Sequence, residues 1–273
     1  AMRFNSDSQK LEYWNGSAWF QVHTATPNLA TGSLGSDKQP GARGVFQGGI
    51  TPSESATVDY INISSTGDAI DFGDLSATRR LGAAFASSTR VFTFGGFDGS
   101  DATTEVEFFV FASTGDAIDF GSAIDNATRS NGGAANATRG LSLGGTAPKG
   151  DDIDYITMAS NGSSVNRFGG PITSPGSTIT QAYGTASPTR AVFGGGETPG
   201  RIATLQFVNI ATLGDAQDFG DLTASVSGVA AFGNATRGIF GGGEISPNFL
   251  STMESINFAS TGNAVIFGEL TQG

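Results

Sequence analysis

The sequence predicts an all-β protein: a five-bladed β-propeller with four-stranded blades, preceded by a small β-hairpin. Three observations support this prediction. A unit is repeated five times at a spacing of roughly 47 to 52 residues, which is typical of propeller blades. Short runs of β-branched and aromatic residues alternate with polar ones. Glycine or proline interrupts these runs every few residues, and closure of five units into a ring would leave no long exposed strand edge.

The composition limits the partners and the chemistry of the protein. The 273-residue chain has a formal net charge of −11, so neither nucleic acid nor a membrane is expected as a partner, because anionic surfaces are bound by clustered Lys and Arg. No apolar run approaches the roughly 20 residues of a membrane-spanning helix. The chain has no cysteine, which excludes disulfides, thiolate catalysis and cysteine metal sites.

Residues 1–23 are expected to form an N-terminal β-hairpin module, and residues 24–273 to form the propeller. Asn15-Gly16 lies between two aromatic-rich runs, at 11–14 and 18–22. Both turn residues readily adopt positive φ, which is typical of a two-stranded hairpin turn. The only histidine, His23, falls in the segment that leads to the first repeat.

Each repeat is expected to contain the same strands in the same order. The first strand starts at an arginine and runs into paired glycines, and the next ends four residues before another glycine. The arginines are Arg43, Arg90, Arg139, Arg190 and Arg237. The following strand carries a Phe-Gly pair, whose phenylalanines are Phe72, Phe120, Phe168, Phe219 and Phe267. Large apolar residues at these positions suit the space between adjacent sheets.

A strand of small residues completes each unit and is expected to be the innermost strand, where blades crowd the central axis. Its copies are predicted at 81–86, 132–136, 180–184 and 228–232, with the copy for the first unit within 32–37. If 32–37 is an inner strand of the first blade, the blades are contiguous and closure depends on the packing of blade one against blade five. If the blades instead begin at Arg43, this segment completes the last blade as a strap.

The N-terminal sequence MRFNSDSQKLEYWNGSAWFQV resembles a β-hairpin module of tailed-bacteriophage virion and tail-fibre proteins. The resemblance covers less than a tenth of the chain. The matching residues are Arg3, Phe4, Asn5, Lys10, Leu11, Glu12, Asn15, Gly16 and Trp19. It implies a virion protein that is attached to other virion proteins, with the hairpin as a possible site of homo-oligomerisation.

The repeat TRVFTFGG-FDGSDATT-EVEFFVF-ASTG-DAIDFG resembles a kelch repeat over about residues 29 to 270. It differs from that family in its outer strand, which carries phenylalanine where kelch blades usually carry tryptophan. It is more similar to the kelch-like STGDAxDFGDL repeats of phage and marine viral structural proteins. This second resemblance also implies a structural protein of the virion, such as a tail fibre.

No catalytic residue, metal or cofactor is predicted. One histidine cannot supply a histidine-rich metal site, and the copper oxidases built on kelch blades need cysteine and more histidines than this chain has. Carboxylates remain, since some five-bladed propellers are glycosidases with paired carboxylates. Most acids here recur once per unit beside turns, as Asp68, Asp116 and Asp215 do. Such acids are more typical of turn capping than of catalysis, and no EF-hand calcium pattern is present.

The repeated arginines leave two interpretations open. A ring of five arginines around the axis could bind an anion. Alternatively, each guanidinium could donate to turn carbonyls of its own blade or of the next one.

The loops that follow the paired glycines differ in length and chemistry in every copy, and they are expected to lie on one face together with the connections between blades. Packing restricts framework residues, whereas recognition loops are free to differ. The alternative is sequence drift in loops under no constraint. The candidate binding residues are Phe97, Asp98, Asp101, Lys149, Asp151, Asp152, Glu197, Arg201, Glu244, Asn248 and Phe249.

These observations together predict a non-enzymatic, virion- or tail-associated phage propeller that binds a glycan or protein of the host surface through these variable loops. Two alternatives remain. One is a carbohydrate-active enzyme with an axial carboxylate pocket, and the other is a purely structural assembly module.

Overall fold

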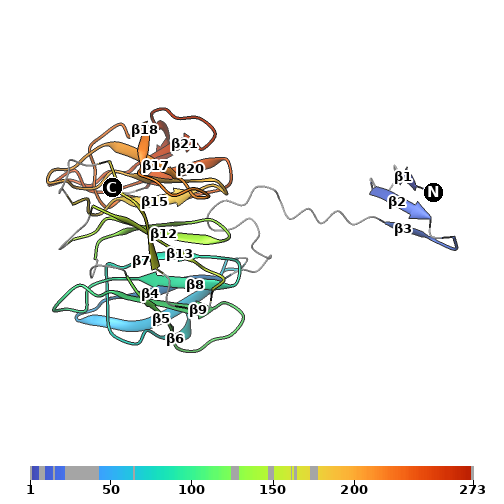
Figure 1. Cartoon of the computed structure of the whole chain (residues 1–273), viewed down its shortest axis with the longest axis horizontal. Helices are drawn as coiled ribbons and strands as arrows, with labels where there is room; N and C mark the ends of the chain where they lie inside the picture. The colour runs from blue at the N-terminus through green and yellow to red at the C-terminus, as the bar shows by residue number, and fades with distance from the viewer. Residues whose placement is uncertain are drawn as a thin grey trace.

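A computed structural model describes residues 2–5, 10–14, 16–21, 43–63, 65–123, 129–146, 151–160, 162, 165–172 and 178–271. All regular structure in these residues is β-strand. Five antiparallel sheets follow one another along the chain as the blades of a β-propeller (Figure 1), which confirms the predicted fold class. Within the described ranges, no helix is long and apolar enough to cross a membrane.

The first blade contains three described strands and the other four contain four each. Blade 1 consists of β4 (Arg43–Ile50), β5 (Glu54–Asn62) and β6 (Ile70–Asp74). Blade 2 consists of β7 (Ala83–Ala86), β8 (Arg90–Phe94), β9 (Glu105–Val110) and β10 (Ile118–Ser122). Blade 3 consists of β11 (Gly132–Ala135), β12 (Arg139–Leu143), β13 (Ile153–Thr157) and β14 (Val165–Gly169). Blade 4 consists of β15 (Tyr183–Ala186), β16 (Arg190–Gly194), β17 (Thr204–Asn209) and β18 (Gln217–Asp221). Blade 5 consists of β19 (Ala230–Gly233), β20 (Arg237–Gly241), β21 (Thr252–Asn257) and β22 (Val265–Glu269).

The N-terminal module is a small sheet of three strands, β1 (Met2–Asn5), β2 (Lys10–Trp14) and β3 (Trp19–Gln21). The predicted hairpin is confirmed as the pairing of β2 with β3, and β1 adds to it in antiparallel register. The rings of Trp14 and Trp19 lie with their centroids 5.6 Å apart. Residues 22–42, which include His23 and the predicted domain border, lie outside the described residues.

Three of the four described inner strands start two or three residues later than the sequence predicted, whereas that of blade 3 starts at Gly132 as predicted. In blade 4, the strand expected at 180–184 lies at Tyr183–Ala186. In all four of these blades, the residue two positions before the inner strand adopts a positive φ, which is 61° at Leu81, 58° at Ser130, 56° at Gln181 and 71° at Gly228. This left-handed conformation is incompatible with a β-strand, so it separates the connection between blades from the inner strand.

The sheet order decides between the two arrangements considered for ring closure. Strand β7 pairs with β8 rather than with β6, and β19 pairs with β20. Blade 5 therefore has all four of its strands without residues 32–37, and the strap arrangement is wrong. The blades are contiguous, and the inner strand predicted for blade 1 within 32–37 lies outside the described residues.

Small residues allow the inner strands to approach one another around the axis. Strand β11 lies between β7 and β15, and β15 in turn lies beside β19. At Gly133, an added Cβ atom would lie 2.7 Å from the carbonyl oxygen of Ala84, which is closer than real Cβ contacts come. The prediction that the small-residue strands are innermost is therefore confirmed, and the large side chains fill the space between blades farther from the axis.

Candidate functional site

The loops that follow the paired glycines lie beside the connections between blades. Phe97 forms a β-bridge with Arg80, Glu197 with Thr180, and Glu244 with Ser227. We call this surface the loop face; it comprises residues 97–104, 197–203 and 244–251 with the connecting residues Arg80, Arg129, Thr180 and Ser227. Three of the sequence-predicted binding residues thus occupy the same structural position in three blades.

A phenylalanine between two arginines forms the first cluster on the loop face. The guanidinium carbon of Arg80 lies 5.3 Å from the ring centroid of Phe97, and that of Arg129 lies 4.4 Å from it. Arg80 also pairs with Glu54 of blade 1, with Nε 3.2 Å from Oε1. The Nε of Arg129 donates a hydrogen bond of 3.0 Å to the hydroxyl of Thr146. These contacts fix both guanidinium groups, and both remain partly exposed.

An arginine between two carboxylates forms the second cluster. Nη2 of Arg201 lies 2.7 Å from Oε1 of Glu244, and its Nε lies 3.4 Å from Oε1 of Glu197. The buried hydroxyl of Ser227 donates to Glu197 and accepts from Arg201, each at 3.1 Å. Glu197, Arg201 and Glu244, all predicted from the sequence, therefore come together across the joint between blades 4 and 5.

Asp98 organises its own loop. Its Oδ1 accepts hydrogen bonds from the backbone N–H groups of Asp101 and Ser100, both at 2.8 Å. The bond from Asp101 and then that from Ser100 hold the pKa of the Asp98 carboxyl below its ordinary value of 3.8. Asp98 thus stays ionised and closes the turn that presents the exposed Asp101.

The remaining predicted residues do not join either cluster. Asp152 forms an ion pair of 2.7 Å with Arg167 of β14, and Asp151 next to it is partly buried. Asn248 is exposed, and Phe249 is an exposed apolar side chain at the blade 5 loop. Lys149 lies outside the described residues.

Sequence reasoning did not include Arg80, Arg129 and Ser227 among the binding residues. Each lies ten positions before the arginine that starts the first strand of its repeat unit, and Thr180 occupies the same position in the fourth unit. Two arginines at one repeat position were therefore visible in the sequence. Their contact with Phe97, however, depends on the pairing of a loop with a connection 17 to 32 residues away.

The repeated arginines act as framework residues. In four blades, the guanidinium Nη1 donates to a backbone carbonyl of the next blade. These bonds run from Arg43 to Phe111 (3.0 Å), from Arg90 to Met158 (3.2 Å) and Ser160 (2.7 Å), from Arg139 to Ile210 (2.6 Å) and from Arg190 to Phe258 (2.8 Å). Of the two interpretations, the structure thus supports carbonyl binding rather than a ring of free cations.

The repeated aspartates also connect blades. Oδ1 of Asp116 accepts from the backbone N–H of Asp74 in the preceding blade at 3.1 Å, and Oδ1 of Asp215 accepts from Gly170 at 2.9 Å. These acids are therefore used by the scaffold at equivalent positions. No group of three or more His, Asp or Glu that could hold a metal ion occurs within the described ranges.

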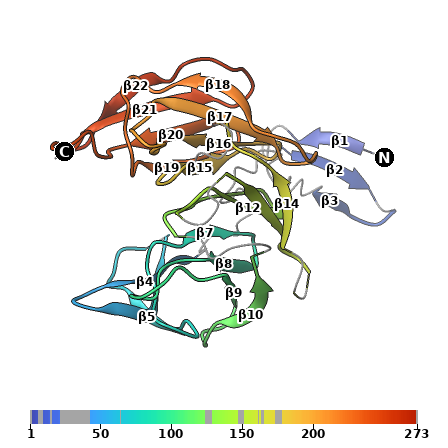
Figure 2. The same ribbon diagram turned by 60° about the vertical axis from the view of Figure 1, so that its left-hand side comes forward.

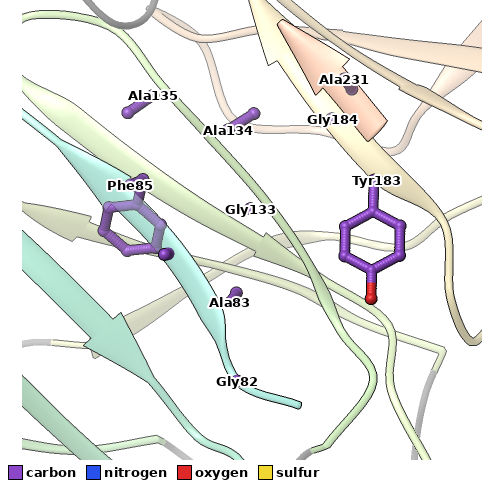
Figure 3. A pocket seen from close by; sticks show the side chains of 10 residues that line it. Gly82, Ala83, Phe85, Gly133, Ala134, Ala135, Tyr183, Gly184 and Ala231 are labelled. Carbon is purple, nitrogen blue, oxygen red and sulfur yellow. The ribbon is translucent and has the colours of Figure 1, made fainter. Parts of the chain in front are cut away.

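A cavity of about 210 Å³ lies among the inner strands and is lined mainly by glycine and alanine (Figure 3). Phe85 and Tyr183 are its two large lining side chains. Burial raises the pKa of the Tyr183 hydroxyl above its usual value of 10.0. Among the described residues that line this cavity there is no carboxylate pair of the kind that glycosidases use.

The fold and the two clusters define the class of protein: a five-bladed β-propeller whose framework polar residues link its blades and whose loop face carries additional arginine, carboxylate and aromatic side chains. Neither a scan against protein-family models nor a search of curated proteins found a match to this chain.

Proposed function

We propose that this chain is a non-enzymatic, virion- or tail-associated phage propeller that binds a glycan or protein of the host surface through its loop face. The cluster of Phe97, Arg80 and Arg129 is the observation that supports this proposal most strongly. An aromatic ring supplies apolar contact area, and guanidinium groups supply several fixed hydrogen-bond donors. Binding hot spots commonly combine these two residue types.

The contrast between the loop face and the framework supports a binding role for the loops. The joints between blades use residues that recur in every unit, such as Arg139, or in three of the five, such as Asp215. Phe97 is the only aromatic residue at its repeat position, which is occupied by Ile50, Thr146, Glu197 and Glu244 in the other units. Side chains that differ between otherwise equivalent loops on a rigid scaffold are typical of recognition surfaces.

The charge of the Phe97 cluster favours a particular glycan chemistry. Arg80 is neutralised by Glu54, whereas no carboxylate of the described residues pairs with Arg129. This cation stands on a protein with a net charge of −11. A sugar that carries a carboxylate could bind the guanidinium of Arg129 through paired hydrogen bonds and stack its apolar face near Phe97. Acidic saccharides are therefore the glycans that we expect to bind best.

The virion assignment depends on the two resemblances, that of the N-terminal module and that of the STGDAxDFGDL repeats. In this proposal, the three-stranded module attaches the propeller to other virion proteins or to further copies of the chain, and the propeller faces the host. The location would then be the extracellular virus particle.

The proposal is tested by applying the labelled full chain to an array of acidic and neutral glycans and to whole bacterial cells. Binding to carboxylated glycans, lost at high salt, is the expected result. Absence of binding to any glycan, cell or surface protein would overturn the proposal. Release of reducing sugar from a bound glycan would instead support the carbohydrate-active enzyme.

A further inference from the structure

Backbone hydrogen bonds join the connections between blades around the axis on the loop face. The amide of Ser130 donates to the carbonyl of Leu81 at 2.7 Å. The amide of Gln181 donates to Ser130 at 2.7 Å, and that of Gly228 donates to Gln181 at 3.1 Å. Each of these residues belongs to a different connection and has the positive φ described above. We call these four residues the rim, because their hydrogen bonds run from blade to blade.

Both side-chain clusters of the loop face begin directly beside the rim. Arg129 of the first cluster precedes Ser130, and Ser227 of the second cluster precedes Gly228. Neighbouring Cα atoms are about 3.8 Å apart, so each cluster is attached to the rim by a single peptide unit. A ligand that is held by either cluster can therefore extend to the space inside the rim.

The axial cavity of about 210 Å³ starts next to the rim. Gly82 directly follows Leu81, and Tyr183 follows Gln181 by two positions; both Gly82 and Tyr183 line the cavity. Figure 2 shows the inner strands β7 and β15 on opposite sides of the centre of the array. A cavity of about 150 Å³ holds a benzene molecule. The axial cavity therefore has room for one six-membered ring but not for two.

Tyr183 departs from the repeat pattern inside this cavity. Ala83, Gly132 and Ala230 occupy its position on the other described inner strands. Its side chain is half-buried, and its hydroxyl forms no hydrogen bond with another described residue. In Figure 3, the rings of Tyr183 and Phe85 border the cavity from two sides. Since small residues suffice for packing at the axis, the tyrosine supplies what packing does not need: an apolar ring face with a free hydroxyl.

Backbone groups of the inner strands add hydrogen-bonding capacity to the cavity. After β15, the amide of Ser187 donates to the carbonyl of Arg190 at 2.8 Å. Hydrogen-bonded and non-hydrogen-bonded pairs alternate along an antiparallel ladder, so Gly184, three residues earlier, points its N–H and C=O away from β16. The same alternation holds on the other described inner strands, where the equivalent residues are Ala84, Gly133 and Ala231. All four residues line the cavity, which thus has both donors and acceptors.

We propose that the axial cavity is a subsite for one neutral sugar residue at the end of a glycan chain, and that Tyr183 determines which sugar enters. This inference rests on the proposed function, since the rest of the glycan would lie on the loop face. Sugar hydroxyls both donate and accept, as the backbone groups of the cavity do, and the rings of Tyr183 and Phe85 pack on the apolar C–H groups of the sugar.

The lining of the cavity explains why the bound residue is neutral and terminal. Among the described residues that line it there is no charged side chain, and a carboxylate without a partner is costly to bury. Because the cavity holds a single ring, an internal residue with sugars on both sides does not fit. The carboxylated residue next to the chain end therefore stays outside the rim and binds Arg129.

NMR of the unmodified full chain, labelled with carbon-13 in its tyrosine rings, tests the subsite directly. The chain has four tyrosines, and the signal of Tyr183 is identified as the one absent from Tyr183→Phe. The probes are glucose, galactose, rhamnose and N-acetylglucosamine at millimolar concentration, with glucuronic acid as the charged comparison. We expect at least one neutral sugar to shift the Tyr183 signal saturably and glucuronic acid to leave it in place. No shift with any neutral sugar, or an equal shift with glucuronic acid, would overturn the proposal.

A cavity-filling variant separates the subsite from the rest of the loop face. Ala231→Leu enlarges a side chain that lines the cavity, and Ala211→Leu, exposed after β17, is the matched control. We expect A231L to weaken binding of the sugar that shifts Tyr183 by tenfold or more, and A211L to leave it unchanged; equal binding by both variants would refute the subsite. Acidic glycans that need Arg129 but tolerate A231L would refute the subsite alone, and the proposed function would stand. A neutral sugar that shifts Tyr183, without binding of any glycan, cell or surface protein, would refute the proposed function alone.

Discussion

Replacement of Phe120 by alanine tests whether the Phe-Gly strands stabilise the propeller through contacts between blades. Phe120 is 1% exposed and shares a buried cluster with Ile156 and Met158 of the next blade, besides packing edge-to-face on Phe92 of its own blade. Loss of a fully buried phenylalanine removes about 1.5–3 kcal/mol of burial free energy. A remaining cavity on the order of 50–100 Å³ adds about 1–2 kcal/mol. The variant F120A should therefore lower the free energy of unfolding by about 3–5 kcal/mol.

The control is Ile118→Ala on the same strand, where the side chain is 48% exposed. A substitution at such a surface position should change stability by about 0.5 kcal/mol or less. Guanidinium denaturation followed by far-UV circular dichroism measures both variants. Tryptophan fluorescence would not serve, because Trp14 and Trp19 belong to the N-terminal module. Equal losses of stability in the two variants would refute the assignment of Phe120 to the joint between blades.

Three further predictions follow from the same contacts. Gly140→Ala should cost about 1–3 kcal/mol in a denaturation experiment, because the new methyl group would meet the ring of Phe85; unchanged stability would contradict this packing. Arg139→Gln should lower stability by about 1–2 kcal/mol through loss of the 2.6 Å bond to the carbonyl of Ile210; an unchanged melting temperature would argue against this role of the bond. In a carbon-13 NMR titration, the Asp98 carboxyl should titrate below 3.8. Its contribution to the stability of the turn should therefore be fully present above the pKa that Asp98 has in the unfolded chain, and should be lost as the pH falls through the lower pKa of the folded protein. Titration at or above 3.8 would contradict the two backbone hydrogen bonds.

Much of the propeller was predictable because the same pattern of strands and turns is repeated five times in the sequence. A strand that starts at Arg139 is ambiguous when read alone, but four equivalents fix its start. The inner strands of blades 2 and 4 were placed less well, because Leu81 and Gln181, which the prediction included in these strands, adopt positive φ without being glycine. Leucine and glutamine side chains do not by themselves indicate that conformation, which is imposed by the pairing of the connection with the neighbouring loops.

The candidate site was predictable only in part. Differences between loops identified Phe97, Glu197, Arg201 and Glu244, and the structure brings the last three together. The guanidinium of Arg129 escaped notice because it reaches Phe97 from the connection to the next blade. Such a contact requires knowledge of which loop pairs with which connection, and the order of residues along the chain does not supply it.

The most direct test of the binding proposal is the affinity for the carboxylated glycan that binds best on the array, measured by calorimetry for two variants. Arg129→Ala on the loop face should weaken binding by tenfold or more, which corresponds to about 1.4 kcal/mol. Leu213→Ala, an exposed position in the turn between β17 and β18 at the opposite end of the blade, should leave the affinity unchanged. Equal affinity of both variants and the unmodified chain would contradict the central claim that the loop face recognises the ligand.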